Sequence, residues 1–311
     1  EIAVVYALGE CAMESGIQGR STSAHMRKLA EKRNVVGVVL RADSPGGDAL
    51  PSDLVAEATR KIREAKRPVV VSQGGVAASG GYWISMDGSK VLTTPFTVTG
   101  SIGVIGGWFW DAGLGGKTGF RAEGVQRGSH ADLMTGIRFP FLGGVLGAVP
   151  ERNLSDREKE LMKARIVGYY DLFVRKVAAG RNLPEARVRE LGEGRIWMGG
   201  DAIERGLADR FGTLQDAVSE AKALAGLKPD DEVILSEYPP RRAFSLPRLG
   251  MGLPGARLLS WIGLGRGSDG GDAAFEKGYT LAYLRALAAS RGGPLLMVPP
   301  DNLPSGWELE P

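Results

Sequence analysis

Two short motifs rich in glycine and serine are the parts of this sequence best suited to chemistry. The first, DSPGG at residues 43–47, directly follows an apolar run that ends at Leu40. The second, AASGGYW at residues 77–83, follows the run from 69 to 72. Each motif falls at a predicted turn from a strand to a helix, where α/β folds place ligands and reactive groups. We therefore expect both motifs to contribute to one site.

Ser79 is the predicted nucleophile. Its small neighbours permit a sharp turn that exposes the hydroxyl, and the next helix begins with free N–H groups and the positive end of its dipole. The N–H of Gly80, with a second from Gly46 or Gly47, would stabilise an oxyanion, and losing one such donor typically costs about 3 kcal/mol in the transition state. Ala77 replaces the first glycine of G-x-S-x-G, which argues against an α/β-hydrolase. Glycine-rich turns with a capping serine are the structural alternative.

The composition limits other chemistries. The 311 residues include two histidines, His25 and His130, and one cysteine, Cys11. A histidine-rich metal site, a cysteine-based metal site and an intrachain disulfide are therefore excluded, and no cofactor is predicted. The net charge of +3 is spread along the chain, which disfavours binding to nucleic acid. No window approaches about 20 uninterrupted apolar residues, so no transmembrane helix is predicted.

The elements that position these motifs alternate between strand and helix. Apolar runs predict buried, mostly parallel strands, and amphipathic patterns predict helices, so the fold class is α/β. The strands are expected at 1–6, 35–40 and 69–72, and the helices at 24–32, capped by Ser21, Thr22 or Ser23, and at 51–66. After Pro150 further helices are expected at 154–179 with a capping box at 155–158, 184–192, 199–206, 214–224 and 273–291. Residues 238–271 are expected to be extended.

Together the motifs resemble the signal peptide peptidase A family. DSPGG, AASGGYW and TGSIG at 99–103 occur in the family's order, and the similarity continues at 124–134 and 194–209. The resemblance covers residues 1–226, which it implies are the serine peptidase domain, with 227–311 as a C-terminal extension. It implies a spiral of repeated strand-strand-helix units, as in Clp protease and crotonase, with helical C-terminal additions.

The resemblance also implies an activity and its surroundings. It implies a serine/lysine dyad that cleaves signal peptides left in a bacterial membrane after export, with no metal. Ser79 matches the nucleophile, and Ser101 matches a serine that orients the lysine. The partners implied are an apolar peptide or signal peptide and further copies in a homo-oligomeric ring. The domain is expected to be soluble, associated with the membrane and on its periplasmic or extracytoplasmic side.

One position departs from the family's pattern. In the segment 128–133, Ala131 occupies the place of the lysine. Tandem members carry the lysine in their first half and the serine in their second, and the start of this chain inside a strand suggests such a second half. The base would then come from a lysine-bearing homologous half or a neighbouring subunit. An engineered change, or a natural pseudopeptidase that serves as a silent peptide-binding or oligomer scaffold, explains Ala131 equally. A crotonase-type thioester enzyme is a weaker alternative.

Other candidate bases have simpler explanations. Lys90 and Lys117 are expected to be surface lysines, and His130 to face away from the lysine's side of the strand. His25 is expected on a helix surface, and Cys11 to be a small buried hydrophobe. The aromatic cluster at 108–110 is interpreted mainly as core, with an apolar substrate wall or a membrane-facing rim as the alternative.

Overall fold

The computed structural model describes residues 1–119, 125–133, 136 and 149–239. These residues form two compact units, and each is described by itself. The first unit contains residues 1–104 and 170–239, and the second contains the described residues from 105 to 169.

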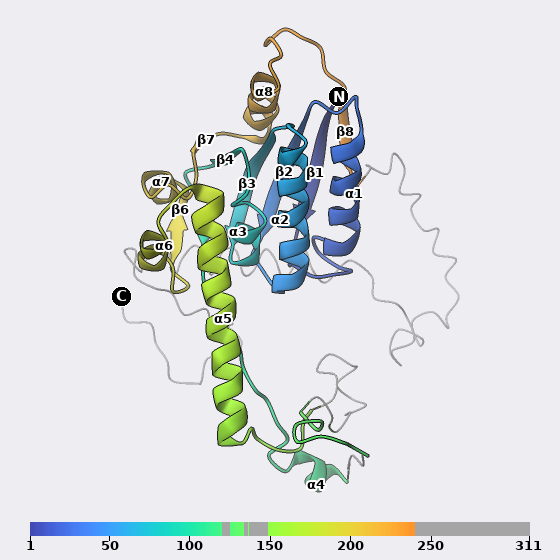
Figure 1. Ribbon diagram of the computed structural model, residues 1–311, viewed down its shortest axis with the longest axis vertical. Helices are drawn as coiled ribbons and strands as arrows, with labels where there is room; N and C mark the ends of the chain where they lie inside the picture. The colour runs from blue at the N-terminus through green and yellow to red at the C-terminus, as the bar shows by residue number, and fades with distance from the viewer. Residues whose placement is uncertain (120–124, 134–135, 137–148, 240–311) are drawn as a thin grey trace, which may run out of the picture. The chain divides into compact units, whose positions relative to one another are not determined.

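The first unit is built around one sheet of eight described strands (Figure 1). The strand order is β6-β5-β3-β2-β1-β8, and β4 pairs with both β3 and β7. Every pair is parallel except β5 with β6, so the prediction of an α/β fold with mostly parallel strands is confirmed. The strands are β1 (Ile2–Leu8), β2 (Gly37–Ser44), β3 (Val69–Ala78), β4 (Lys90–Thr93), β5 (Val98–Gly100), β6 (Ile196–Met198), β7 (Arg210–Phe211) and β8 (Leu235–Tyr238).

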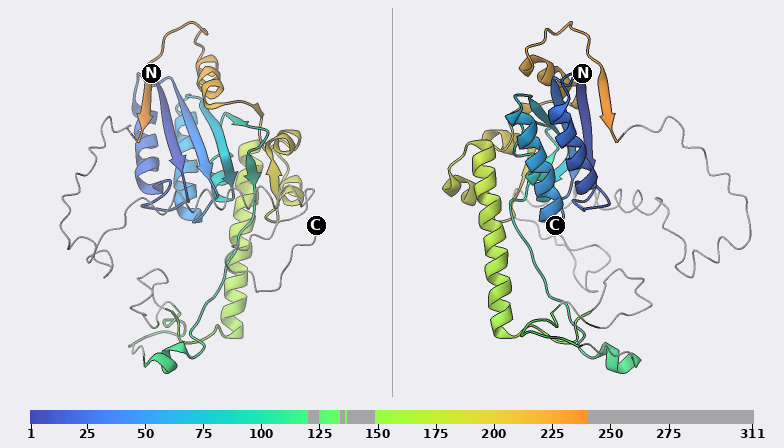
Figure 2. Two further views of the ribbon diagram at one scale, coloured as in Figure 1. Left: turned by 180° about the vertical axis from the view of Figure 1, so that it is seen from behind. Right: turned by 45° about the vertical axis from the view of Figure 1, so that its right-hand side comes forward.

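Helices cover both faces of the sheet (Figure 2). Val38 and Leu40 of β2 belong to the larger core, which they share with α1 and α2, whereas Val39 belongs to a smaller core with Ala217 and Ala221 of α8. Successive side chains of a strand point to opposite faces, so a strand covered on both faces is apolar along its length. The helices with residues in this unit are α1 (Gly19–Glu31), α2 (Ala49–Glu64), α3 (Gly80–Trp83), α5 (Asp156–Arg181), α6 (Glu185–Leu191), α7 (Gly199–Glu204) and α8 (Leu214–Leu224).

The start of α1 differs from the prediction. The helix begins at Gly19, and its N-cap is Gln18 in the left-handed region, so none of the hydroxyl residues at 21–23 caps it. Thr22 lies inside the first turn, where its Oγ1 donates to the carbonyl of Ile17 at 2.7 Å. A hydroxyl can bond to the backbone from inside the first turn as well as from the cap position. The sequence pattern therefore predicts the start of this helix several residues too late.

The helices predicted between Pro150 and residue 224 are confirmed to within a few residues. The start of α5 has the predicted capping box. Glu158 Oε2 accepts from the N–H of Ser155 at 2.8 Å, and the N–H of Glu158 donates to Ser155 Oγ at 3.4 Å. This reciprocal pair uses N–H groups that the helix itself leaves unpaired.

The second unit contains the short helix α4 (Leu114–Thr118) and the first part of α5. Its aromatic cluster corrects an expectation, because Phe109 is 81% exposed and Trp110 is 41% exposed. Trp108 is half-buried, and its Nε1 donates to the carbonyl of Arg152 at 3.3 Å. Core packing was the favoured interpretation and is wrong for Phe109 and Trp110. The sequence pattern does not reveal that this segment leaves the sheet-centred core.

Part of the predicted organisation lies outside the described residues. This holds for the helix at 273–291 and for nearly all of the extended segment at 238–271. The division into 1–226 and 227–311 stays a prediction. Within the described part, β8 lies beyond residue 226 and pairs with β1, joining Ile2 to Leu235 and Val5 to Tyr238.

Candidate active site

Ser79 lies at the turn between β3 and α3. Its backbone has φ 53° and ψ −118°, and it is the N-cap residue of α3. A non-glycine residue at positive φ is uncommon, and such strain persists only where the surroundings enforce it, often at active sites. A sharp turn of this kind at the end of a strand is suited to presenting a serine hydroxyl.

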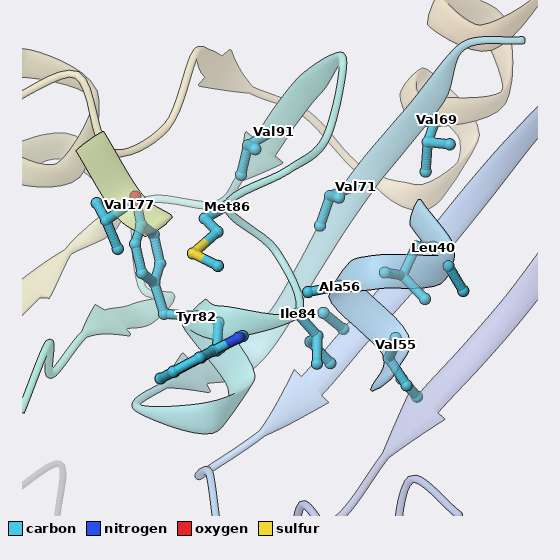
Figure 3. Close-up of a cluster of buried hydrophobic side chains, with 14 of the residues drawn as sticks. Leu40, Val55, Ala56, Val69, Val71, Tyr82, Ile84, Met86, Val91 and Val177 are labelled. Carbon is cyan, nitrogen blue, oxygen red and sulfur yellow. The ribbon is translucent and has the colours of Figure 1, made fainter. Parts of the chain in front are cut away.

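The packing of α3 holds this turn in place. The N–H groups of Tyr82 and Trp83 donate to the carbonyl of Ser79 at 3.0 and 2.9 Å. Tyr82 is fully buried, and its hydroxyl donates to the carbonyl of Leu207 at 3.0 Å. Figure 3 shows Tyr82 in the larger core, where Met86 and Val177 also pack. The core therefore stabilises the strained conformation of Ser79.

Gly46 of the first motif packs directly against Ser79. Its φ is 107°, and a β carbon there would lie 2.7 Å from the β carbon of Ser79 and 2.9 Å from the nitrogen of Gly80. Carbon atoms do not approach so closely without displacement, so only glycine fits this position. The two motifs singled out from the sequence therefore meet here.

Two backbone N–H groups beside this contact are unused. Among the described residues, neither Gly47 nor Gly80 has an acceptor for its N–H. The N–H of Gly46 instead donates to Ser44 Oγ at 3.2 Å. Of the three glycines predicted to form an oxyanion hole, Gly47 and Gly80 are thus the two with an available donor, while the oxyanion-binding role itself stays a prediction.

Cys11 supports the first motif through its backbone. Its N–H donates to the carbonyl of Gly46 at 2.7 Å, and its carbonyl accepts from the N–H of Asp48 at 2.8 Å. In this short parallel bridge, the N–H of Gly47 points away from Cys11. Cys11 is 1% exposed, and burial raises the pKa of its thiol. The prediction of a small buried side chain at Cys11 is confirmed.

Asp43 belongs to the framework of this site, which the sequence analysis missed. Its Oδ1 accepts from the N–H of Val76 at 3.1 Å, and a β carbon on Gly74 would lie 2.2 Å from its carboxyl carbon. The contact lies where the register between β2 and β3 shifts, between Ala42 and Ser44. An acid at the end of an apolar strand was the available signal, because such a side chain can bond to neighbouring backbone.

Ser101 lies beside Ser79 at the end of the neighbouring strand. The β3–β5 register pairs Ala78 with Gly100, and the N–H of Ser79 donates to the carbonyl of Gly100 at 2.9 Å. Ser101 also has a positive φ, 48°, and its N–H donates to the carbonyl of Arg195 at 2.7 Å. The two serines that the resemblance singles out are therefore next to each other in register.

The hydroxyl of Ser79 has no base among its described hydrogen-bond partners. It makes no side-chain capping bond, and no described lysine, histidine or carboxylate bonds to it. The helix that follows is only four residues long, so its dipole contributes little to stabilising an oxyanion at Ser79. Available N–H groups and the strained turn are the main features of the site.

Ala131, the predicted vacant base position, lies in the second unit and is exposed. Both of its neighbours are held by side-chain hydrogen bonds. His130 Nδ1 lies 2.8 Å from Glu158 Oε1, and Arg152 Nε donates to Asp132 Oδ2 at 2.5 Å. Arg152 also donates to both oxygens of Glu158, and these bonds, with that of His130, lower the pKa of the Glu158 carboxyl. His130 is therefore engaged with a charged carboxylate.

Among the remaining candidate bases, Lys90 and Lys117 match the simpler expectation, whereas His25 is more buried than expected. Lys90 Nζ lies 3.9 Å from Asp209 Oδ1, and its side chain is 43% exposed. Lys117 is exposed on α4. His25 is half-buried on α1 and stacks on Tyr238 with ring centroids 3.9 Å apart, and burial lowers the pKa of its imidazole.

Similarity to known proteins was found both in sequence and in structure. The chain is 38% identical over 228 residues to a chloroplastic serine protease SPPA of Arabidopsis thaliana, which covers 73% of this chain and 32% of the relative. It is 33% identical over 220 residues to protease 4 of Haemophilus influenzae, covering 71% and 33%. The chain thus spans about a third of the length of these relatives. A solved ClpP1 variant from Listeria monocytogenes superposes with a TM-score of 0.46 at 14% identity. The superposition covers 69% of this chain and 94% of that one.

A match to the model of a protein family shows which family this chain belongs to. The model of peptidase family S49 matches residues 61–228, which is more than half of the chain. That segment includes Ser79 and Ser101. The chain belongs to peptidase family S49.

Proposed function

We propose that this chain carries the nucleophile of a serine endopeptidase that degrades signal peptides or other apolar peptides at a membrane. The observation that carries the proposal is the strained turn that holds Ser79 against Gly46, next to the available N–H groups of Gly47 and Gly80. Membership of a peptidase family favours peptide hydrolysis over thioester chemistry of the crotonase type. This combination supports acyl transfer through Ser79.

The reaction would proceed in two stages. Ser79 Oγ attacks the carbonyl carbon of the peptide bond and gives its proton to a lysine amine, while Gly47 and Gly80 donate to the oxyanion. Collapse of the tetrahedral intermediate breaks the C–N bond, and the lysine returns the proton to the leaving amine. Water then attacks the acyl-enzyme in the same way and releases the second product with Ser79 restored.

The lysine would come from another half or another chain. A lysine amine accepts a proton near neutral pH only when its pKa is lowered, and removal from water is the usual cause. Ser101 follows the strand next to that of Ser79, which supports a role in which its hydroxyl would orient the amine by a hydrogen bond. In this proposal a lysine-bearing homologous half or a neighbouring subunit completes the site, within a homo-oligomeric ring.

Exposed apolar side chains support an apolar substrate and a location at a membrane. In the second unit, Ile105 is 99% exposed and Phe109 is 81% exposed. Such side chains commonly mark surfaces that bind apolar partners. None of the described helices is long and apolar enough to span a bilayer. The extracytoplasmic location remains part of the proposal, on the strength of the family resemblance.

A silent scaffold is the second candidate function. Ala131 favours it, because a serine without a base is a weak nucleophile and general-base catalysis typically contributes 10²–10⁴-fold. In that case the surface around Ser79 would bind peptides without cleaving them, or the chain would build the oligomer. The two functions differ in whether Ser79 is ever acylated.

Mixing the chain with its lysine-bearing homologous half tests the proposal. Each part alone should hydrolyse an apolar peptide at close to the background rate, and the assembled mixture should cleave it. Ser79→Ala in this chain should abolish that activity without preventing assembly, which size-exclusion chromatography would show. A mixture that assembles and binds the peptide, yet leaves it intact, would favour the scaffold.

A further inference from the structure

A second feature of the first unit is a basic pocket lined by residues of α2, α5 and the turn that follows α3. Arg60 and Arg63 come from the last part of α2. At 1.5 Å per residue, they lie about 18 and 22 Å along that helix from Asp48, its N-cap beside the candidate active site. Arg175 and Lys176 come from α5. The pocket is therefore separate from Ser79 and its glycines.

The charges that line this pocket are unbalanced. Four cationic side chains, those of Arg60, Arg63, Arg175 and Lys176, line it together with one carboxylate, that of Asp87. Two of these cations pair with carboxylates outside the lining, Arg60 with Glu57 and Lys176 with Asp53. Asp87 Oδ2 is 3.8 Å from Arg60 Nε, a weak ion pair at best. Cations that converge from two helices repel one another, and this arrangement costs stability unless an anion compensates it.

Several donors in the pocket lack a strong acceptor. Arg60 Nε is buried without a hydrogen-bond partner among the described residues. Arg63 donates to the backbone carbonyl of Asp87 at 2.8 Å, and no described carboxylate pairs with either Arg63 or Arg175. Lys176 is different, since it already pairs with Asp53 at 2.5 Å. The guanidinium groups of Arg63 and Arg175, together with Nε of Arg60, are thus the donors left for a ligand.

The size and donor type indicate the ligand's chemistry. The pocket has a volume of about 260 Å³, several times the roughly 30 Å³ share of a water molecule. Planar guanidinium forks match the oxygens of phosphate groups and bind them in a bidentate way. An anion with more than one negative charge compensates several cations at once, which favours a phosphate over a single carboxylate.

We propose that this pocket binds a phosphate group, through Arg63 and Arg175 as the main ligands and Arg60 as the buried donor. The phosphate belongs either to a free ion or small phosphorylated molecule, or to the headgroup of an anionic phospholipid. Ser79 takes no part in this binding.

Calorimetry with inorganic phosphate tests the proposal on the full chain. We expect saturable binding that weakens as the salt concentration rises, because the pairing is electrostatic. Arg175→Ala should weaken it at least about tenfold, since a charge-assisted bond is lost. Asp87→Asn should tighten binding, because it removes the only carboxylate in the described lining. Arg20→Ala, which removes an equal charge from the exposed Arg20–Glu14 pair, is the matched control and should leave binding unchanged.

Vesicles distinguish the two sources of phosphate. If the ligand is a lipid, the chain should sediment with phosphatidylcholine vesicles that contain phosphatidylglycerol, and Arg175→Ala should reduce this where Arg20→Ala does not. If it is a small molecule, phosphate should bind in solution while vesicle binding is absent or equal in both variants. The proposal is overturned if no saturable phosphate binding occurs up to about 10 mM, or if Arg175→Ala and Arg20→Ala bind phosphate equally.

Discussion

Ser79 and Ser101 directly follow Ala78 and Gly100, the paired last residues of two neighbouring parallel strands, and both serines have a positive φ, 53° and 48°. The N–H of Ser79 bonds to the carbonyl of Gly100, so the backbone itself joins the two turns. Non-glycine residues rarely adopt this conformation, and two of them side by side indicate that the sheet edge enforces a particular arrangement of hydroxyls. An amine that enters beside Ser79 would therefore meet Ser101.

This relationship predicts the effect of removing the second hydroxyl. Ser101→Gly keeps the positive φ without strain and removes only the side chain. In the assembled peptidase it should lower kcat by about 10–100-fold, a loss consistent with one orienting hydrogen bond of 1.5–3 kcal/mol. It should also move the pH at which activity rises, because the lysine loses a hydrogen-bond partner. An unchanged pH profile with reduced activity would instead indicate a purely structural role.

The close contact at Gly46 predicts that a substitution there lowers peptidase activity although it replaces no reacting group. Gly46→Ala places a β carbon 2.7 Å from that of Ser79, so the turn must shift. Activity should fall by at least about 100-fold, comparable to the loss of an oxyanion donor. Gly75→Ala is the control, since its β carbon would meet only Asp43, at 4.0 Å. The idea of a rigid contact would fail if both variants kept the activity of the unchanged chain.

A lysine at the vacant position should supply the missing base. Ala131 is exposed, and the side-chain hydrogen bonds of His130 and Asp132 hold its segment, so Ala131→Lys should be accommodated without a loss of folding. We expect the assembled variant, in which contact with a neighbouring subunit removes this lysine from water and lowers its pKa, to react with a serine-directed fluorophosphonate about 10²–10⁴-fold faster than the unchanged chain. Ser129→Lys adds the same charge two residues away and should not have this effect. Equal labelling of the two variants would argue against Ala131 as the base position.

Much of the framework could be predicted because local pattern and burial agree. The uninterrupted apolar run at 35–40 predicts β2, since that strand is covered on both faces. The glycines around Ser79 predict a sharp turn, which the structure shows. The site's detailed bonding could not be predicted, because Gly46 and Gly47 are identical in sequence terms. Contacts made in the fold distinguish them, among them the bond from the N–H of Gly46 to Ser44 and the packing of Gly46 against Ser79.

The errors have a common physical origin in tertiary context. Phe109 and Trp110 are of residue types that are usually buried, yet both are exposed and belong to the second unit, outside the unit that contains the sheet. Burial depends on what covers a side chain, and a run of three aromatic residues contains no information about that. The late boundary predicted for α1 has a similar cause, since the hydroxyl of Thr22 bonds within the first turn and does not cap it.

The last prediction concerns stability and pH at Asp87. Burial raises the pKa of its carboxyl to about 6, although Arg60, Lys176 and Arg63 oppose the shift. The folded chain therefore binds this proton more tightly than the unfolded chain, whose Asp pKa is about 3.9, so ionisation costs stability as pH rises from about 4 to about 6. Asp87→Asn lacks this cost. Its stability relative to the unchanged chain should rise across that window by roughly 3 kcal/mol at most, measured by urea unfolding at several pH values. Asp156→Asn is the control with the opposite sign, because the bond from Lys159 lowers the pKa of Asp156. A difference between Asp87→Asn and the unchanged chain that stays constant with pH would show that Asp87 does not titrate in this way.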